Sequence, residues 1–179
     1  MWRCNEKVSG GAGMTNAISV KEGLKKQAIE DGKAMQDKLV TYGLERTIYR
    51  LSVSKYAEKF EAIVSLGLAN SRYKDFYDIY VLADSYDLDG MELMKAIVET
   101  FIHRETNFDD IAAFDDDFTK DETRQRRWRA FIKKKKALVK VEFEETMQLL
   151  KELLLPIVDL IYNNNSFEQT WSKETKSWR

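Results

Sequence analysis

Apolar residues recur along most of the chain at intervals of three and four, the spacing of one face of an α-helix. The clearest stripe is Phe76, Ile79, Tyr80 and Ala83. Ser19 with Glu22, and Asp89 with Glu92, have the spacing of helix-opening capping boxes. Seven helices are predicted. The first is opened by Ser19, and four more lie over about 35–51, 60–67, 70–83 and 89–101. A sixth bears Trp128, Phe131 and Ile132, and the seventh covers about 139–162 and is kinked by Pro156.

One segment, 47–53, reads as a β-strand, but a single strand cannot form a sheet. The pattern therefore predicts a mainly α protein, a helical bundle. Four parts are expected: a disordered N-terminal extension at 1–13, an N-terminal helical segment at 14–54, a C-terminal helical domain at 55–163, and a flexible tail at 164–179.

Composition narrows the class of protein. The chain has 179 residues, of which 44% are hydrophobic, and its 29 Lys and Arg nearly balance its 30 Asp and Glu. One cysteine, Cys4, and one histidine, His103, exclude a disulfide framework and the usual zinc clusters. No apolar run approaches the roughly 20 residues of a membrane span, and residues 1–13 lack the apolar centre of a signal peptide. We expect a cytoplasmic protein with no membrane partner.

The segment 70–78, NSRYKDFYD, combines charge with aromatic rings. On a helix, Lys74, Asp75 and Asp78 lie three and four residues apart, so their side chains can converge on one spot. That geometry suits a site for phosphate and metal. Acidic residues in a first helical turn also suit the helix dipole without any ligand, and both interpretations stay open.

A basic run occupies 124–140, with nine cations and no acid. Such a run predicts a surface that follows nucleic-acid phosphates. The alternative is that it neutralises the seven acids between Asp109 and Glu122, and Trp128 and Phe131 fit a core better than a base-stacking platform. The candidate nucleic-acid-binding residues are Arg124, Arg126, Arg127, Arg129, Lys133, Lys134, Lys135 and Lys136.

Several stretches resemble a known protein family. Residues 56–80, YAEKFEAIVSLGLANSRYKDFYDIY, are similar to the carboxy-terminal half of the AbiEii-type nucleotidyltransferase toxins, the toxin arm of type IV toxin–antitoxin and phage abortive-infection systems in bacteria. Residues 100–106, TFIHRET, look like that family's TF-x-R-x-T element, and the resemblance continues through 128–131 to the last Leu-Pro-Ile helix. Residues 14–54 look like the helices that open the same proteins, so nearly the whole chain is covered.

Between those halves the family carries a catalytic sheet, with a glycine-rich motif and an Asp-x-Asp pair that holds magnesium and the triphosphate. No such block stands between Ser54 and Ala57, and the Asp-x-Asp at Asp87 to Asp89 belongs to a turn in the other half of the chain. The resemblance therefore implies an internal deletion with its junction in 54–60. The expected fold resembles the helical parts of an α+β nucleotidyltransferase without most of its β-sheet core.

The resemblance also implies site residues. In the family's later motifs a lysine meets the triphosphate and an aspartate assists the reaction centre. The matching catalytic candidates here are Lys59, Lys74, Asp75 and Asp78. For Lys59, a solvated lysine beside Glu58 and Glu61 is the alternative. Two carboxylates on one helix supply too few oxygens for octahedral magnesium, so we expect this chain alone to bind neither magnesium nor a nucleoside triphosphate.

Two hypotheses of function follow. The first is a nucleotidyltransferase toxin of a type IV toxin–antitoxin system, internally truncated and catalytically impaired. The second is a non-enzymatic helical remnant that binds a cognate antitoxin or RNA such as transfer RNA. Helices that evolved against a sheet would expose their apolar stripes without it, which favours either homo-oligomerisation or repacking into a bundle.

Overall fold

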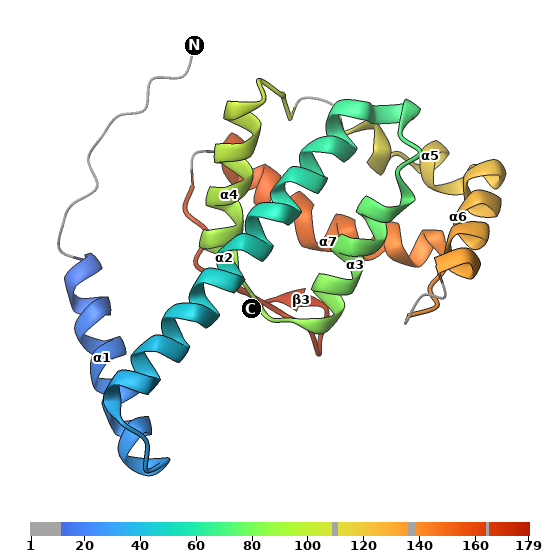
Figure 1. Ribbon diagram of the computed structural model, residues 1–179. Helices are drawn as coiled ribbons and strands as arrows, with labels where there is room; N and C mark the ends of the chain where they lie inside the picture. The colour runs from blue at the N-terminus through green and yellow to red at the C-terminus, as the bar shows by residue number, and fades with distance from the viewer. Residues whose placement is uncertain (1–11, 109–110, 136–138, 164) are drawn as a thin grey trace. The chain divides into compact units, whose positions relative to one another are not determined.

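The computed structural model describes residues 12–108, 111–135, 139–163 and 165–179, with side chains from residue 19 onward. The predicted extension at 1–13 therefore lies outside the described residues up to position 11. In chain order (Figure 1) the elements are α1 Ala12–Glu30, α2 Met35–Leu66, η1 Gly67–Ala69, α3 Tyr73–Ser85, β1 Leu88–Asp89, α4 Gly90–His103, η2 Ala112–Phe114, α5 Asp116–Lys120, α6 Glu122–Lys135, α7 Phe143–Tyr162, β2 Thr170–Ser172 and β3 Ser177–Trp178.

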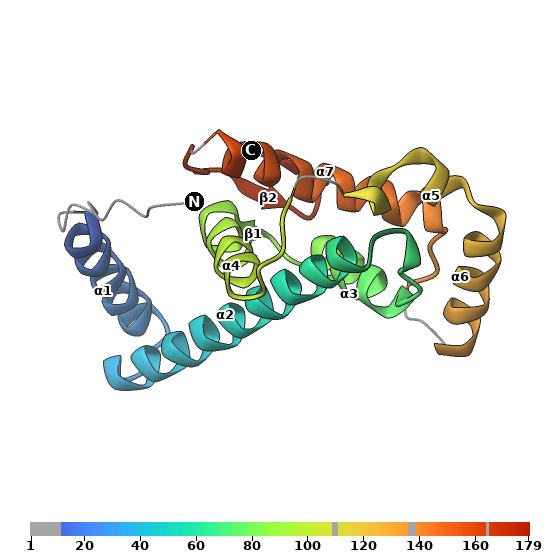
Figure 2. The same ribbon diagram turned by 90° about the horizontal axis from the view of Figure 1, so that it is seen from above.

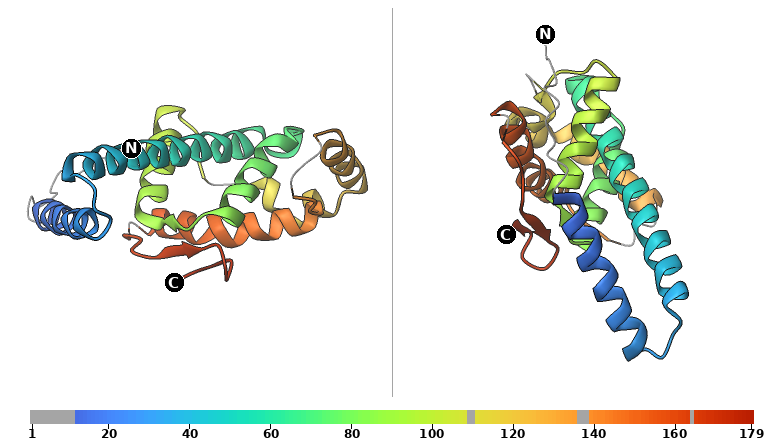
Figure 3. Two further views of the ribbon diagram at one scale, coloured as in Figure 1. Left: turned by 60° about the horizontal axis from the view of Figure 1, so that its bottom comes forward. Right: turned by 90° about the vertical axis from the view of Figure 1, so that its left-hand side faces the viewer.

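The chain divides into two compact units, 1–49 and 50–179, and each is described by itself. The predicted domain boundary near residue 54 stays a prediction. In the described part of the first unit, α1 and the start of α2 form a helical hairpin (Figure 3). Gly32 has a φ of 63° and ends α1, and the Lys33 N–H donates to the Ala28 carbonyl. Ser19 lies inside α1, so its predicted capping role is wrong.

The α2 helix is continuous where the sequence predicted two helices separated by a break. The predicted strand at 47–53 is wrong, because those residues are helical. The reason is visible in the buried residues that follow, since Val53, Ala57, Phe60 and Val64 keep helical spacing and all pack inward. An inward-facing stripe of this kind favours helix over the strand propensity of a short β-branched segment.

The core of the second unit is built on α7. Its apolar face packs against α3, α4, α5 and α6. Figure 2 shows α7 extending from the side of α4 to the side of α5. Around Phe143 the core is aromatic: its ring centroid lies 5.3 Å from that of Trp128 and 5.8 Å from that of Phe76. Asp89 caps α4 as predicted, because its side chain accepts a hydrogen bond from the Glu92 N–H at 2.9 Å.

The C-terminal residues 165–179 are folded onto this unit, so the predicted flexible tail is wrong. Strands β1, β2 and β3 form an antiparallel sheet in that order. The ring of Trp171 is fully buried and its Nε1–H donates to the Ala83 carbonyl at 2.8 Å, while Trp178 Nε1–H donates to Leu153. Two indole rings with satisfied N–H groups are strong anchors for a short segment.

The chain is mainly α, as the sequence predicts. Within the described residues the sole sheet is the small one made by β1, β2 and β3, whose strands are two or three residues long. In the same residues, no helix is both long enough and apolar enough to cross a membrane.

Candidate functional site

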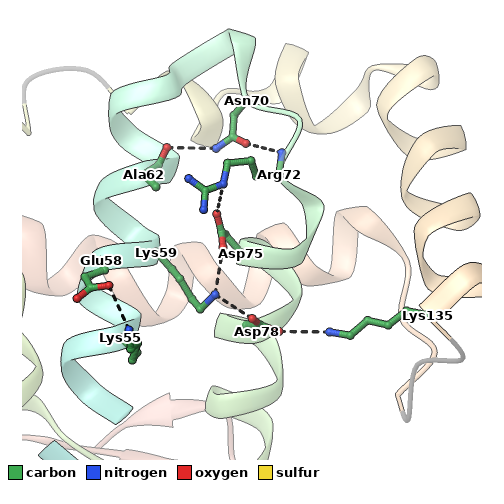
Figure 4. A network of polar contacts seen from close by, with 9 residues as sticks. All are labelled: Lys55, Glu58, Lys59, Ala62, Asn70, Arg72, Asp75, Asp78 and Lys135. Atoms are coloured by element: carbon green, nitrogen blue, oxygen red, sulfur yellow. Dashed lines mark hydrogen bonds and ion pairs between the residues drawn. The ribbon is translucent and has the colours of Figure 1, made fainter. Parts of the chain in front are cut away.

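Three of the predicted catalytic residues meet between α2 and α3. Lys59 extends from α2, and its Nζ lies 3.1 Å from Asp75 Oδ1 and 2.8 Å from Asp78 Oδ2 on α3 (Figure 4). The two aspartates are three residues apart, so α3 presents both carboxylates to the same ammonium group. We call Lys59, Asp75 and Asp78 the α2–α3 cluster.

Backbone contacts set where α3 begins and so fix its carboxylates. Asn70 is buried, its side-chain amide donates to the Ala62 carbonyl at 3.3 Å, and its Oδ1 accepts from the Arg72 N–H at 2.8 Å. The guanidinium of Arg124 donates to the carbonyls of Asn70, at 2.7 Å, and Leu68. The turn that joins α2 to α3 is therefore held from both sides.

Two further cations approach the same carboxylates. Arg72 Nε lies 2.8 Å from Asp75 Oδ2, an ion pair without hydrogen-bond alignment. Lys135, at the end of α6, lies 3.4 Å from Asp78 Oδ1. The Asp75 side chain is only 4% exposed, and a buried carboxylate is stable only when it is paired. Lys59, Arg72 and Lys135 thus more than compensate two negative charges.

The charges of the cluster act on neighbouring titratable groups. Partial burial alone would lower the pKa of Lys59, but hydrogen bonds and charge attraction from Asp78 and Asp75 outweigh it and raise that pKa above its ordinary value. Burial raises the pKa of Tyr56, and the negative charge of Asp78 raises it further. Lys59 is therefore firmly protonated, as suits an ammonium that binds anionic groups.

The fourth predicted catalytic residue is elsewhere. Lys74 is exposed on α3 and makes none of the ion pairs described above. Sequence reasoning missed two cations that do contact the carboxylates. The spacing of Arg72 and Asp75, three residues apart at the start of α3, could have indicated the first. No local signal links Lys135 to Asp78, because 57 residues separate them.

The residues present do not fit a magnesium site. Both carboxylates of the cluster are engaged with lysine or arginine, and an octahedral Mg²⁺ needs several oxygen ligands. In the part of the chain that the structure describes, no three His, Cys, Asp or Glu side chains are gathered as metal ligands would be.

On α6, some of the predicted nucleic-acid-binding residues contact other parts of the protein, and others are exposed. The neighbouring Trp128 marks the inner side of this helix. Trp128 is fully buried and its Nε1–H donates to the Val141 carbonyl at 2.7 Å, so it belongs to the core. Arg124 and Lys135 lie on the same inner side of α6, with the Arg124 guanidinium 3.8 Å from the Phe118 ring centroid. Arg129 lies 3.7 Å from Glu142, and Lys136 is outside the described residues. The remaining members, all exposed, are Arg126, Arg127, Lys133 and Lys134.

One buried polar contact was missed altogether. Glu61 is 4% exposed and accepts hydrogen bonds from Arg104 Nη1 at 2.8 Å and Thr106 Oγ1 at 2.6 Å. Its position in the stripe of Ala57, Phe60 and Val64 was the available signal, because an acid at a core position needs partners. The pair ties α2 to the end of α4.

A groove of about 1000 Å³ lies between α4 and residues 50–58 of α2. Glu58, Glu99 and Lys95 are among the side chains that line it, so its walls carry both signs of charge. None of Lys59, Asp75 and Asp78 lines it, and the candidate site is the α2–α3 cluster instead.

Comparison with known protein families shows which family the chain belongs to. The family model described as nucleotidyl transferase AbiEii toxin, type IV toxin–antitoxin system, matches residues 54–149. The chain belongs to the AbiEii family. No curated protein and no solved structure gives a match.

The AbiEii match contains the whole α2–α3 cluster, together with Arg72, Lys135 and α6. It begins at Ser54, inside α2, and does not extend to the resemblance noted for residues 14–53. The AbiEii assignment therefore rests on the helices that carry the cluster.

Proposed function

We propose that this AbiEii-family chain supplies one wall of a nucleotidyl-transfer site and is catalytically impaired without a second. The supporting observation is the α2–α3 cluster, in which Asp75 and Asp78 are both engaged by cations. Nucleotidyl transfer needs acidic groups that hold metal ions against the triphosphate, and carboxylates neutralised by lysine and arginine serve that purpose poorly. The retained Lys59 fits a former triphosphate contact.

An internal truncation accounts for this arrangement. The AbiEii match starts at Ser54, and α2 passes through the suggested junction at 54–60 as a continuous helix. A deletion that fuses two helices in phase preserves the inward stripe of Val53, Ala57 and Phe60 and so leaves a foldable chain. Sequencing the locus in independent isolates tests this. A longer frame with a sheet-coding insert at 54–60 is expected in relatives; the same short frame in every isolate would contradict a recent deletion.

The enzymatic part is tested by label transfer. The chain is incubated with each labelled nucleoside triphosphate, magnesium and total transfer RNA, beside a family member that has the glycine-rich and Asp-x-Asp motifs. We expect no label on RNA above the protein-free blank, while the intact relative transfers label. Clear transfer by this chain that is lost in Asp75→Asn but kept in Lys74→Gln would overturn the proposal.

A second function is RNA binding without catalysis, and the exposed cations of α6 favour it. At 100° per residue, Arg126, Arg127, Lys133 and Lys134 fall on one side of the helix, centred on Ala130 and opposite Trp128. Arginines and lysines that share an exposed face can contact successive phosphates. A cognate antitoxin with an acidic surface is the other partner that this face would fit.

Salt dependence tests the RNA function. If about four phosphates are contacted, the logarithm of the affinity for transfer RNA should fall steeply with the logarithm of salt concentration. Arg126→Gln with Lys134→Gln should weaken binding about tenfold at low salt, since each lost phosphate contact removes one counterion-release step. Lys95→Gln, an exposed lysine on α4, is the matched control. Affinity that is flat with salt, or unchanged in the α6 variant, would contradict RNA binding by this face.

A further inference from the structure

The first half of α2 carries an apolar stripe that is exposed to solvent. Val40 is 53% exposed, Leu44 is 60% exposed and Leu51 is 62% exposed; Ile48, which completes the stripe, is 63% exposed. At 100° per residue, these four positions fall in a sector about 80° wide on the helix. A contiguous row of large apolar side chains on a soluble surface marks an interaction site more often than isolated ones do.

Two opposite charges bound the stripe in the same sector. Asp37 precedes it and Lys55 follows it, and each lies nine residues from position 46, the centre of the stripe. The distance along the helix between them is about 27 Å. Within the stripe, Thr47 Oγ1 donates to the Gly43 carbonyl at 2.8 Å, so its hydroxyl needs no water. Burial of Thr47 would therefore leave its hydroxyl hydrogen with a partner.

We propose that the stripe binds a second copy of this chain, with the two α2 helices antiparallel about a two-fold axis near residue 46. In that register Leu44 faces Ile48 of the second copy, and Asp37 faces its Lys55 at both ends. Opposite charges at both ends favour this pairing over a parallel one, which sets Asp37 against Asp37 and Lys55 against Lys55. A two-fold contact of this kind is self-complementary, as in most homodimers.

An ion pair with Glu58 of the same chain competes only weakly with the proposed pairing of Lys55. Lys55 Nζ lies 3.7 Å from Glu58 one turn along α2, but the lysine side chain is 70% exposed and such surface pairs contribute little. Among the side chains described for residues 19–49, the buried apolar ones are Leu24 and Ala28. Two such hairpins joined through α2 form a four-helix arrangement, which buries the stripe that a single hairpin leaves exposed.

Sedimentation of the full chain over a range of concentrations tests the proposal. We expect a reversible dimer in the parent chain, and in Leu44→Glu a dimerisation constant at least about 100-fold weaker, because the contact would bury two unpaired carboxylates. The matched control is Leu68→Glu, on η1, where the leucine is 62% exposed. Both variants should give the parent's circular dichroism spectrum, since neither side chain is buried. A chain that stays monomeric, or a dimer that Leu44→Glu does not weaken, would overturn the proposal.

Charge exchange tests the antiparallel register. Asp37→Lys and Lys55→Asp should each weaken the dimer about tenfold, and the double variant should regain the parent's affinity because the pairs are restored with reversed signs. Glu30→Lys, at an exposed position on α1, is the control and should leave the dimerisation constant unchanged. Weakening in both single variants that persists in the double variant would rule out the antiparallel register proposed for the two α2 helices.

Discussion

Two leucines that each belong to a regular apolar stripe have opposite environments in two regions of the molecule. In the unit of residues 50–179, Leu150 on α7 is fully buried among the side chains of neighbouring helices. In the N-terminal part of α2, Leu44 is 60% exposed although its spacing to Val40 and Ile48 is as regular as any in the chain. Helical periodicity predicts both stripes equally well. Whether a stripe is buried depends on what else the chain supplies to cover it.

The difference has a simple physical origin. Residues 50–179 contain several helices and a C-terminal sheet, so α7 can be surrounded by α3, α4, α5 and α6. In the part of residues 1–49 that the structure describes, only α1 and the start of α2 are present. Two helices can bury one stripe between them, here Leu24 and Ala28, and leave any second stripe in water.

The largest expected effect separates the two leucines. Leu150→Ala should lower the free energy of unfolding by about 2 to 5 kcal/mol, because it removes buried methyl groups and leaves a cavity. Leu44→Ala should change it by less than about 0.5 kcal/mol when measured at concentrations where the chain is monomeric. Urea unfolding followed by circular dichroism measures both. Equal losses at the two positions would mean that Leu44 is covered within a single chain.

A pair of glycines gives a smaller contrast of opposite sign. A Cβ added at Gly90 would lie 2.5 Å from Phe167 Cδ1 and 2.6 Å from the Gln169 carbonyl oxygen. Gly90→Ala should therefore push the C-terminal segment from its place and cost about 1 to 3 kcal/mol. Around Gly43 on α2 there is open space, so Gly43→Ala should stabilise the chain by up to about 1 kcal/mol through helix propensity alone.

Limited proteolysis adds a local measurement to the glycine pair. Gly90→Ala should speed cleavage within residues 165–179, because the Gly90 N–H also donates to the Gln169 carbonyl at 2.9 Å. Gly43→Ala should leave cleavage there unchanged. A stable Gly90→Ala protein with the parent's cleavage rate would show that the C-terminal segment does not depend on this close approach.

These contrasts indicate how much of the fold the local sequence predicts. Periodicity predicts the helices and their inward residues, including the stripes of α3, α4 and α7. It does not predict that α2 continues past Ser54, because the β-branched residues within 47–53 also suit a strand and are helical here as part of a longer helix. It also misses the docking of the C-terminal segment, since the partners of Trp171 and Trp178, Ala83 and Leu153, are distant in sequence.

The candidate site shows the same division. Asp75 and Asp78 are neighbours on one helix, so spacing alone brings them together. Lys59 comes from another helix, and the family resemblance rather than any local pattern pointed to it. The contact of Lys135 with Asp78 depends on how α6 packs. Helical spacing suggested Lys74, but its side chain is exposed and makes no ion pair with the cluster.

The smallest expected effect concerns the pH response of the buried region. Tyr80 on α3 is buried, and burial together with the negative charges of Glu145 and Asp84 raises its pKa to about 12. Between pH 10 and 12 the unfolded chain has therefore lost a proton that the folded chain keeps, so stability falls as pH rises through this window. The loss from Tyr80 should be on the order of 1 to 2 kcal/mol.

Tyr80→Phe isolates this contribution, because phenylalanine keeps the ring and has no proton to lose. The variant should lose less stability than the parent between pH 10 and 12 in urea titrations, whereas Tyr86→Phe, at an exposed position, should not reduce the alkaline loss. Some loss should remain in Tyr80→Phe, since the raised pKa of Lys59 also makes its ion pairs stabilising below its unfolded pKa and weaker as pH rises through the folded one. An unchanged alkaline loss in Tyr80→Phe would mean that the hydroxyl is hydrated in the folded chain. The contrast between a closed core around α7 and an exposed N-terminal hairpin would then be weaker than the burial of Tyr80 implies.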